Sequence, residues 1–240
     1  MWLVEEMLME RIDKVISSQT NYSRKEVMRL VKNGLVMVNG EVISKACMKV
    51  NPDIDKIKIL GNELKVKKYV YLVLNKPKGF ISATEDRSQR TVLELVPLEY
   101  MHRSLFPAGR LDKDTTGLMI ITDDGEFAHN ILSPRKHISK TYNVVIDKPV
   151  SEEMVRGFIG GVMLNDGECK TAELEITGDY TARVVLTEGR YHQIKRMFGC
   201  FGAKVLELER IKMGNLELPK DLKMGECREL TLEELKKITK

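Results

Sequence analysis

An aspartate in a glycine-bounded loop is the strongest candidate for chemistry in this sequence. Asp112 lies in the segment PAGRLDKDTTGLMIITDDG, residues 107–125, and Arg110 precedes it by two positions. Gly109 and Gly117 allow the backbone to turn tightly on either side of the acid. A loop of this kind between two strands can hold a carboxylate rigidly at the floor of a cleft. The segment is therefore predicted to carry the reactive group.

Three other interpretations of this segment compete. A magnesium site would use four acids, Asp112, Asp114, Asp123 and Asp124, but Asp124 is a natural N-cap for the helix that follows the second strand. A phosphate-binding loop would need the spacing GxxxxGK[ST], and the sequence does not contain it. No GxSxG motif or comparable nucleophile elbow occurs, so a catalytic triad is not indicated. We expect no metal, and a magnesium-dependent phosphoryl enzyme stays as a weak alternative.

The elements that must position this loop follow a basic N-terminal segment. Residues 10–68 contain 13 Lys and Arg against 7 Asp and Glu, whereas residues 69–240 contain 26 of each sign. The formal net charge of +4 is thus concentrated in the first quarter of the chain. A compact basic unit attracts a polyanion because binding releases counterions. On charge alone, a merely solvated surface is an equally good interpretation.

The basic segment carries local signals for two helices. Ile12, Val15 and Ile16 recur at helical spacing and predict the first helix. Ser23 and Glu26 form a capping box at the start of the second. Val27, Leu30 and Val31 line the apolar face of that helix, and Gly34 ends it.

A hairpin follows, because Asn39-Gly40 separates two apolar stretches and both residues of such a turn need positive φ. A further strand is predicted at 56–60. This order of elements, with SRKEVMRLVKNGLVMVNG at its junction, resembles the RNA-binding domain that ribosomal protein S-four shares with several RNA-modifying enzymes. The resemblance covers about residues 9–65. It implies contact with structured RNA, for which four side chains match best: Arg24, Lys25, Arg29 and Asn39.

The remainder of the chain is predicted to be rich in strands. We expect strands at 69–74, 117–122, 140–146, 172–176, 182–186 and 205–209, and helices at 126–132, 152–158 and 191–201. The last helix has a core-facing stripe formed by Ile194, Met197, Phe198 and Phe201. Strands and helices alternate irregularly, without Rossmann-like βαβ units. The expected fold class is therefore α+β, with a small N-terminal α/β domain followed by a larger mixed, mainly antiparallel domain.

Four segments in order resemble one enzyme family, the pseudouridine synthases of the ribosomal small-subunit synthase A group. GRLDKDTTGLMIITDDG resembles its catalytic motif, and NKPKGFISATEDRSQRTVLEL resembles its opening NKP-G segment. SPRKHISKTYNVV resembles the segment with the active-site tyrosine, and LTEGRYHQIKRMFGCFGAKVLELERIKMG resembles the long EGR-HQ-KRM signature. Together with the S-four-like domain, the resemblance covers nearly the whole chain.

The resemblance implies a role for each matching residue. Asp112 is the nucleophile, Tyr142 packs its ring against the uracil, and Arg110 fills or holds open the vacated base stack. Lys195 occupies the position of the cation that pairs with the nucleophile and keeps it ionised, with Arg196 as the fallback. His192 and Gln193 are interpreted as scaffold, and His192 is not assigned as a base.

The implied reaction is an isomerisation, in which the base leaves its ribose, turns and reattaches through carbon. No atom is gained or lost, so we expect no cofactor. The target nucleotide must be extruded from the RNA, at a cost of a few kcal/mol. The implied substrate is one uridine of 16S small-subunit ribosomal RNA, free or in a partly assembled small subunit. The alternatives are a large-subunit RNA synthase of the same family and a non-catalytic RNA-binding assembly factor.

The remaining expectations concern organisation and location. We predict an N-terminal extension at 1–8, an S-four-like domain at 9–65, a linker at 66–68 and the catalytic domain at 69–240. No run of residues reaches the roughly 18 apolar residues of a membrane span, and no secretory signal is recognised. Four separated cysteines indicate neither a disulfide framework nor a metal site. We therefore expect a cytoplasmic monomer with no membrane partner.

Overall fold

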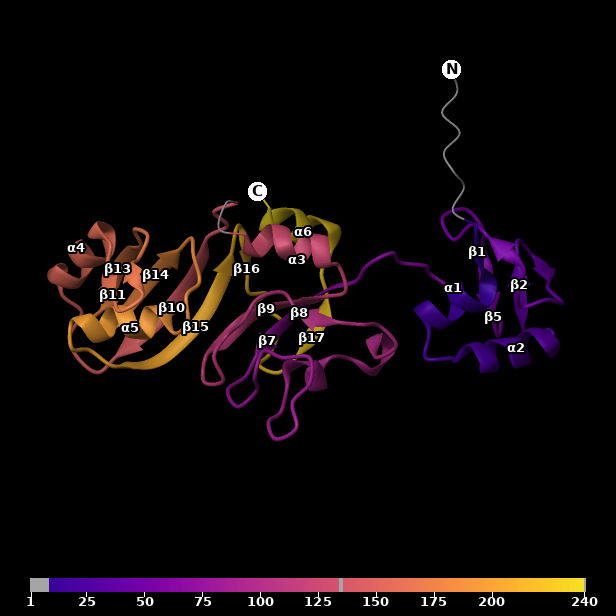
Figure 1. Ribbon diagram of the computed structural model, residues 1–240, viewed down its shortest axis with the longest axis horizontal. Helices are drawn as coiled ribbons and strands as arrows, with labels where there is room; N and C mark the ends of the chain where they lie inside the picture. The colour runs from indigo at the N-terminus through magenta and orange to yellow at the C-terminus, as the bar shows by residue number, and fades with distance from the viewer. Residues whose placement is uncertain (1–8, 134–135, 240) are drawn as a thin grey trace, which may run out of the picture. The chain divides into compact units, whose positions relative to one another are not determined.

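The computed structural model describes residues 9–133 and 136–239, and within them the chain forms two compact units (Figure 1). The described residues up to Tyr69, together with the segment Pro97–Ser104, form the first unit. Val70–Val96 and the chain from Leu105 onward form the second unit. The extension predicted at 1–8 lies outside the described residues. Within the described part of the chain, no helix is long and apolar enough to span a membrane.

The first unit contains two helices and two small sheets. Its elements are β1 (Glu10–Arg11), α1 (Ile12–Gln19), α2 (Arg24–Lys32), β2 (Val36–Val38), β3 (Glu41–Val42), β4 (Lys49–Val50), β5 (Ile57–Ile59), β6 (Asn62–Glu63) and the short 3-10 helix η2 (Leu98–Tyr100). β1 pairs with β4, and the other four strands form a sheet in the order β3-β2-β5-β6. Its core is formed by side chains of α1, α2 and the strands, such as Ile12, Ile16, Val27, Val36 and Ile57.

Local signals in the sequence explain this unit. The Ser23 hydroxyl accepts a hydrogen bond from the backbone N–H of Glu26, and the Glu26 carboxylate accepts one from the N–H of Ser23, so the capping box is confirmed. Asn39 and Gly40 both adopt positive φ, at 52° and 90°, and connect β2 to β3 as the turn requires. The segment Pro97–Ser104, which belongs to this unit although it comes later in the chain, is held by Arg103, whose guanidinium donates to the Lys67 carbonyl.

The second unit is built on one large sheet with strand order β13-β14-β10-β15-β9-β7-β17. Its elements are β7 (Tyr71–Lys76), η1 (Val92–Leu95), β8 (Phe106–Pro107), β9 (Thr116–Thr122), α3 (Gly125–Leu132), β10 (Lys140–Ile146), α4 (Glu152–Gly160), β11 (Met163–Leu164), β12 (Gly167–Glu168), β13 (Glu173–Gly178), β14 (Thr181–Leu186), α5 (Gln193–Cys200), β15 (Val205–Met213), β16 (Leu216–Glu217), β17 (Cys227–Glu229) and α6 (Leu232–Ile238). Its pairs are antiparallel except β15 with β9. The α+β expectation is confirmed.

Two groups of helices cover different parts of this sheet. Helices α3 and α6 lie side by side and share a core with β7 and β9, which includes Val73, Leu118, Ile131 and Ile238 (Figure 1). Helices α4 and α5 meet through the rings of Phe158 and Phe198, whose centroids are 4.9 Å apart. The two halves of the sheet therefore have separate apolar supports.

The two halves join where β9 and β15 pair over only two positions, Thr116 with Glu209 and Gly117 with Arg210. Gly117 has φ +97°, and a Cβ atom there would lie 2.3 Å from the carbonyl oxygen of Arg210. Only glycine allows this approach, since any side chain would both clash and strain the backbone. The glycine that bounds the Asp112 loop therefore also closes the sheet.

The structure changes some predicted boundaries. The helix expected at 191–201 begins only at Gln193, because His192 is in the left-handed region and ends the preceding loop. The strand expected at 69–74 is shifted to β7, and the strand expected at 205–209 continues to Met213. The C-terminal elements β16, β17 and α6 were not predicted from sequence, whereas the strand at 140–146 has the predicted bounds.

Candidate active site

The Asp112 loop runs from β8 to β9 and is held by backbone and side-chain hydrogen bonds. Ser82 fixes its approach, since the Ser82 hydroxyl donates to the Leu111 carbonyl at 2.7 Å and accepts from the Leu111 N–H at 2.9 Å. The N–H of Thr115 donates to the carbonyl of Asp112 at 3.1 Å, which closes a turn. The Asp112 side chain is 25% exposed. The carboxylate is thus fixed, half-buried and reachable from solvent.

A buried lysine at the end of β7 anchors the same loop. The ammonium group of Lys76, whose residue is 0% exposed, lies within 3.4 Å of four carbonyl oxygens, those of Pro77, Asp112, Lys113 and Thr115. An ammonium group has three N–H donors, so these four carbonyl oxygens provide an acceptor for each of them. Burial lowers the pKa of Lys76 to about 8 despite the nearby acids Asp114 and Asp112. This lysine belongs to the NKP-G segment, and no role was predicted for it. The sequence feature that could have indicated a buried role for Lys76 is its position as a charged residue at the end of an apolar strand.

Lys195 lies between two carboxylates of the loop. Its ammonium nitrogen is 3.0 Å from Asp112 Oδ2 and 2.6 Å from Asp114 Oδ1. Burial alone would lower the pKa of Lys195, but its bonds to Asp114 and Asp112 outweigh that effect and raise the pKa. The same bond from Lys195 lowers the pKa of Asp114. The structure therefore brings the predicted pair Asp112 and Lys195 together, and adds Asp114 to it.

The fallback cation is engaged elsewhere. The Arg196 guanidinium forms a two-point ion pair with Asp166, with N–O distances of 2.8 and 3.2 Å. Lys195 and Arg196 are adjacent on α5 and so point in different directions, one toward the Asp112 loop and one toward the turn between β11 and β12. The ion pair of Asp112 is thus made by Lys195.

His192, which was predicted to be scaffold, lies next to Asp112. Its Nε2 atom is 3.4 Å from Asp112 Oδ1, whereas Lys195 contacts the other oxygen of the carboxylate, Oδ2. Its backbone is left-handed, with φ 48° and ψ 34°, and it immediately precedes α5. Gln193 is buried and hydrogen-bonds to Glu188 and to the Arg190 N–H. Gln193 therefore supports the loop as expected, whereas His192 is part of the site.

Tyr142 and Arg110 take different positions around this loop. Tyr142 is 9% exposed and lies in β10, opposite Arg210 of β15, which in turn lies opposite Gly117 of β9. This register places Tyr142 two strands from the end of the Asp112 loop. Arg110 is exposed in the loop itself. Among the described residues, neither side chain forms a hydrogen bond or ion pair with Asp112, so the roles of Tyr142 and Arg110 stay predictions.

The four aspartates of the metal interpretation do not converge. Asp112 and Asp114 precede β9, and Asp123 and Asp124 follow it. The Asp124 carboxylate caps α3 through the N–H of Phe127 at 2.9 Å and accepts the hydroxyl of Tyr71. Over residues 9–133 and 136–239, no cluster of three or more His, Cys, Asp or Glu side chains is arranged to hold a metal ion.

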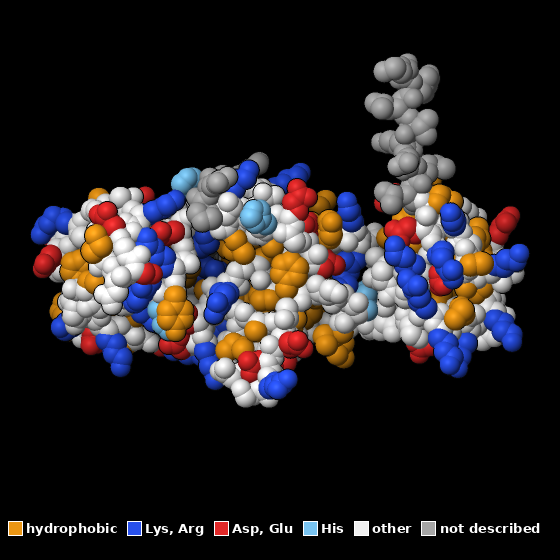
Figure 2. Space-filling view, viewed as in Figure 1, with side chains coloured by type: hydrophobic (Ala, Val, Ile, Leu, Met, Phe, Trp, Pro, Cys, Tyr) orange, Lys and Arg blue, Asp and Glu red, His pale blue; other side chains and the backbone are white. Residues whose placement is uncertain are grey.

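The first unit presents basic side chains on its surface (Figure 2). Arg24, Lys25 and Arg29 are all exposed on α2. Asn39 is also exposed, but its amide donates to Asp55 at 2.8 Å and its carbonyl accepts the N–H of Lys56 at 2.9 Å. The side chain of Asn39 therefore stabilises the hairpin, and any RNA contact at this turn must share its amide or use the backbone.

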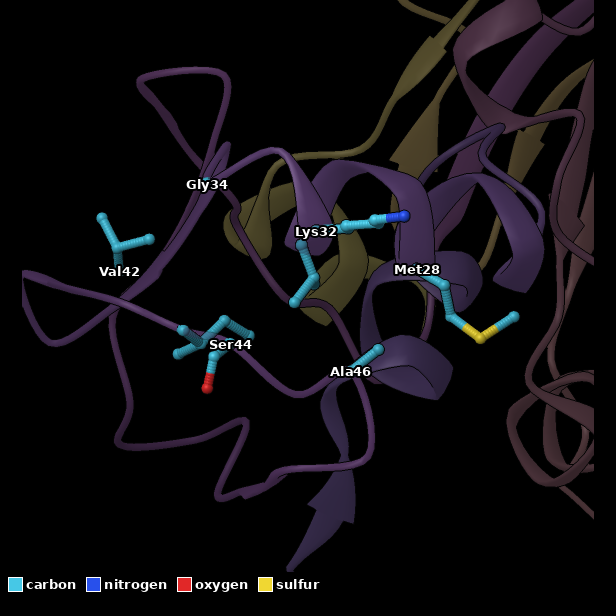
Figure 3. Close-up of a pocket in the computed structure, with 8 residues that line it drawn as sticks. Met28, Lys32, Gly34, Val42, Ser44 and Ala46 are labelled. Carbon is cyan, nitrogen blue, oxygen red and sulfur yellow. The ribbon is translucent and has the colours of Figure 1, made fainter.

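A shallow pocket of about 490 Å³ lies beside this basic helix (Figure 3). Its lining combines Met28, Val31 and Lys32 of α2 with Gly34 and residues of the hairpin and the loop after it, Val42, Ile43, Ser44 and Ala46. Met28 and Val42 are among the exposed apolar side chains of the unit. The pocket is therefore an apolar depression bordered by a cation.

Comparison with known proteins identifies the family. Residues 70–199, more than half of the chain, match the family described as RNA pseudouridylate synthase. The chain belongs to this family. As an RNA pseudouridine synthase it is an isomerase, and residues 10–53 match the S4 domain family, so the first unit is an S4 domain.

Relatives of the synthase match over nearly full length. The chain is 41% identical to an RNA pseudouridine synthase of Bacillus subtilis, over 94% of this chain and 96% of that protein. It is also 41% identical to ribosomal small subunit pseudouridine synthase A of Escherichia coli, over 94% and 98%. A crystal structure of a pseudouridylate synthase matches with a TM-score of 0.68 at 35% identity, covering 95% of this chain and 99% of the other.

Proposed function

We propose that this synthase converts one uridine of 16S small-subunit ribosomal RNA to pseudouridine, with Asp112 as the nucleophile. The observation that carries the proposal is the half-buried Asp112 carboxylate, which is held by the anchored loop and paired with Lys195 at 3.0 Å. A carboxylate acts as a nucleophile only when ionised, and a cation at contact distance favours the ionised form.

The chemistry requires that the bond between ribose C1′ and uracil N1 break and that C1′ bond to C5 instead. The proton on C5 is lost and N1 gains one, so the atoms balance within the nucleoside and water. Because the half-buried Asp112 cannot reach a base inside a helix, we propose that the target uridine is extruded. In this proposal the ring of Tyr142 packs against the uracil, and Arg110 occupies or holds open the gap left in the stack.

The S4 domain is proposed to dock the RNA. Exposed Arg24, Lys25 and Arg29 on α2 offer phosphate contacts, with Asn39 at the adjacent turn. Residues 10–68 carry a net charge of +6, whereas the rest of the chain from 69 is neutral. A long structured RNA can contact both units at once, so that one unit docks the RNA while the other carries out the reaction. We propose the boundaries 9–65 and 69–240 for these two functions, with residues 66–68 as the linker, and that the protein acts as a cytoplasmic monomer.

The choice of small-subunit RNA rests on relatives. Several proteins about 40% identical over nearly the whole chain are named ribosomal small subunit pseudouridine synthase A, including that of Yersinia pestis. A large-subunit RNA synthase of the same family is the alternative, since the residues of the site serve either substrate. A non-catalytic assembly factor is disfavoured by the intact pairing of Asp112 with Lys195.

Mapping pseudouridine in ribosomal RNA from cells with and without this protein tests the proposal. We expect one uridine of small-subunit RNA to lose its modification when the gene is deleted, and the purified protein to restore it. Loss of a modification in large-subunit RNA would transfer the proposal to the alternative substrate. Unchanged modification in both RNAs, together with no activity of the purified protein, would overturn it.

A further inference from the structure

Tyr191 has a highly exposed aromatic ring next to the candidate active site. Its side chain is 71% exposed, the highest value for an aromatic residue among the residues that the structure describes. One face of its ring stacks on the ring of His192, with centroids 3.8 Å apart and an angle of 20° between the planes. Aromatic side chains bury a large apolar area when they fold into a core, and this one does not. The opposite face of the ring is open to a ligand.

The loop that carries this ring is held by several hydrogen bonds of Arg190 and Gln193. The N–H of Arg190 donates to the Gln193 side chain at 3.0 Å, and the amide of Gln193 donates to Glu188 at 2.6 Å. The Arg190 guanidinium donates to the carbonyls of Gly167 and Glu168. These bonds fix the residues on either side of Tyr191 and His192, and His192 itself is left-handed, a conformation that residues other than glycine adopt rarely. The backbone around Tyr191 is therefore well held, and the His192 ring supports the Tyr191 ring on one face, which lowers the cost of ordering on binding.

The stack leads directly to the reactive acid. His192, which supports the Tyr191 ring, lies 3.4 Å from Asp112 through its Nε2 atom. One imidazole ring thus separates an open aromatic face from the carboxylate that is proposed as the nucleophile. Strained backbone of this kind is typical of functional sites, where the fold maintains a costly conformation.

We propose that Tyr191 is a stacking platform for the nucleobase next to the target uridine. The proposal rests on the proposed function, because it requires an extruded uridine at Asp112. When a base leaves the stack, its neighbour loses a stacking partner and exposes a flat ring. Proteins that bind unpaired nucleotides stack such bases on aromatic side chains, and this contact tolerates any base because each has a π-face. Tyr191 would thus position the RNA without reading its sequence.

Fluorescence of 2-aminopurine tests this contact directly. Two RNA oligonucleotides carry the mapped target uridine, with 2-aminopurine on its 5′ side in one and on its 3′ side in the other. They are bound to the Asp112→Asn variant, so that turnover does not interfere. We expect quenching in one of the two, and loss of that quenching in Asp112→Asn combined with Tyr191→Ala. Tyr191→Trp should keep it. No difference between Tyr191 and alanine in either RNA would overturn the proposal.

A steady-state experiment with otherwise wild-type protein gives an independent answer. Tyr191→Ala should raise KM by about fivefold or more, the lower end of what one base–aromatic stack contributes, with a smaller change in kcat. With an abasic site at the neighbouring position, wild type and Tyr191→Ala should have the same KM. If the effect of Tyr191→Ala persists on abasic RNA, the residue acts through the protein and the proposal is wrong.

Two controls separate this proposal from other failures. Tyr180→Ala removes another exposed tyrosine of the same unit, between β13 and β14, and should change neither KM nor quenching. Pseudouridine formation by wild-type protein on the unlabelled RNA reports the proposed function by itself. A wild type that modifies the RNA without any effect of Tyr191→Ala refutes the platform alone, whereas a wild type that never modifies RNA refutes the proposed function.

Discussion

The ammonium group of Lys195 lies 3.0 Å from the carboxylate of Asp112, although 83 positions separate the two residues in the chain. Each side chain keeps about a quarter of its surface exposed, so water screens the pair only in part. Lys195 is brought there by α5 and Asp112 by the loop before β9. The two elements belong to different halves of the sheet, and the ion pair therefore depends on the whole second unit.

Replacing Lys195 with methionine should reduce activity. The substitution removes the ammonium group that contacts the Asp112 carboxylate at 3.0 Å, and it leaves that half-buried carboxylate without this partner. Removing one partner of a fully buried pair costs about 3–5 kcal/mol. Because this pair is partly exposed, we expect a loss of roughly 1–3 kcal/mol, about 5- to 150-fold in kcat/KM.

The neighbouring residues provide controls for this variant. Lys195→Arg keeps the charge and should retain much more activity. Arg196→Met removes the adjacent cation, which pairs with Asp166, and should reduce activity less than Lys195→Met does. If Arg196→Met causes the larger loss and Lys195→Met is near wild type, the assignment of the ion pair to Lys195 is wrong.

The anchor formed by Lys76 should give the enzyme an alkaline limit. Its pKa is lowered to about 8, so the ammonium group is lost as pH rises through that value. A neutral amine has only two donors for the four carbonyls of the loop, and activity should fall above about pH 8. At pH 7 the activity of Lys76→Met should be lower than that of wild type by about tenfold or more, since each unpaired carbonyl costs about 1–3 kcal/mol.

The pH–rate profile from pH 6 to 10 checks this prediction. Lys78→Met is the matched control, because Lys78 is exposed and pairs with Glu207 at the surface. Wild-type activity that stays flat to pH 10, or full activity of Lys76→Met, would show that the loop does not need this anchor.

Sequence alone predicted the parts of the structure that depend on neighbours in the chain. The capping box of Ser23 and Glu26 and the turn at Asn39-Gly40 each lie within a few residues, and both form as predicted. Three members of the predicted helical stripe, Ile194, Met197 and Phe198, are buried because their spacing defines one face. The fourth, Phe201, follows the end of α5 and is half-buried, with its ring stacked on Phe158. The pairing of Lys195 with Asp112 was anticipated only through resemblance to a family.

Features that depend on distant contacts were not predicted. Lys76 gains its role from carbonyls of residues 112, 113 and 115, which its own segment does not indicate. His192 is left-handed between Arg190 and Gln193, which bond to each other and, through Arg190, to the β11–β12 turn, and its own segment does not indicate this conformation. Strand β17 enters the sheet beside β7 across about 150 positions, and no periodicity reveals such a pairing.

The C-terminal helix α6 should make stability depend on pH through Glu234. Its carboxylate accepts two bonds from Arg228 and one from the N–H of Thr231, which together lower its pKa to about 2. A lowered carboxyl pKa stabilises the fold above pH 4.5, and this contribution is lost as pH falls from about 4.5 to 2. Its upper limit is about 3 kcal/mol.

Urea denaturation measures this contribution. Glu234→Gln should lower the free energy of unfolding by about 1–3 kcal/mol at pH 7, and its difference from wild type should shrink as pH approaches 3. Glu233→Gln changes an exposed neighbour on the same helix and should have little effect at either pH. A difference for Glu234→Gln that stays constant with pH would contradict the ionic origin.

The S4 domain should supply most of the salt dependence of RNA binding. Replacing Arg24, Lys25 and Arg29 with glutamine should weaken binding at low salt and flatten the plot of log K against log salt. The slope should fall by about 0.7–0.9 for each lost phosphate contact. Point variants are preferable to truncation, because Pro97–Ser104 belongs to the same unit and would lose its partners.

A charge-matched control distinguishes docking from general attraction. Lys220, Lys236 and Lys237 are exposed in the second unit, and replacing them with glutamine removes the same total charge. This variant should keep nearly the wild-type slope. Equal flattening by both triple variants would show that the S4 domain is not a specific docking surface.

The nucleophile is tested most directly by release of tritium from RNA labelled at carbon 5 of uridine, because that hydrogen leaves when C5 bonds to the ribose. Asp112→Asn keeps the shape of the side chain but removes the proposed nucleophile. Asp221→Asn makes the same change in charge at an exposed position of the second unit outside the site and should retain turnover. We predict release by wild type, none by Asp112→Asn, and an RNA affinity of Asp112→Asn within about tenfold of wild type. Substantial release by purified Asp112→Asn would contradict the assignment of Asp112.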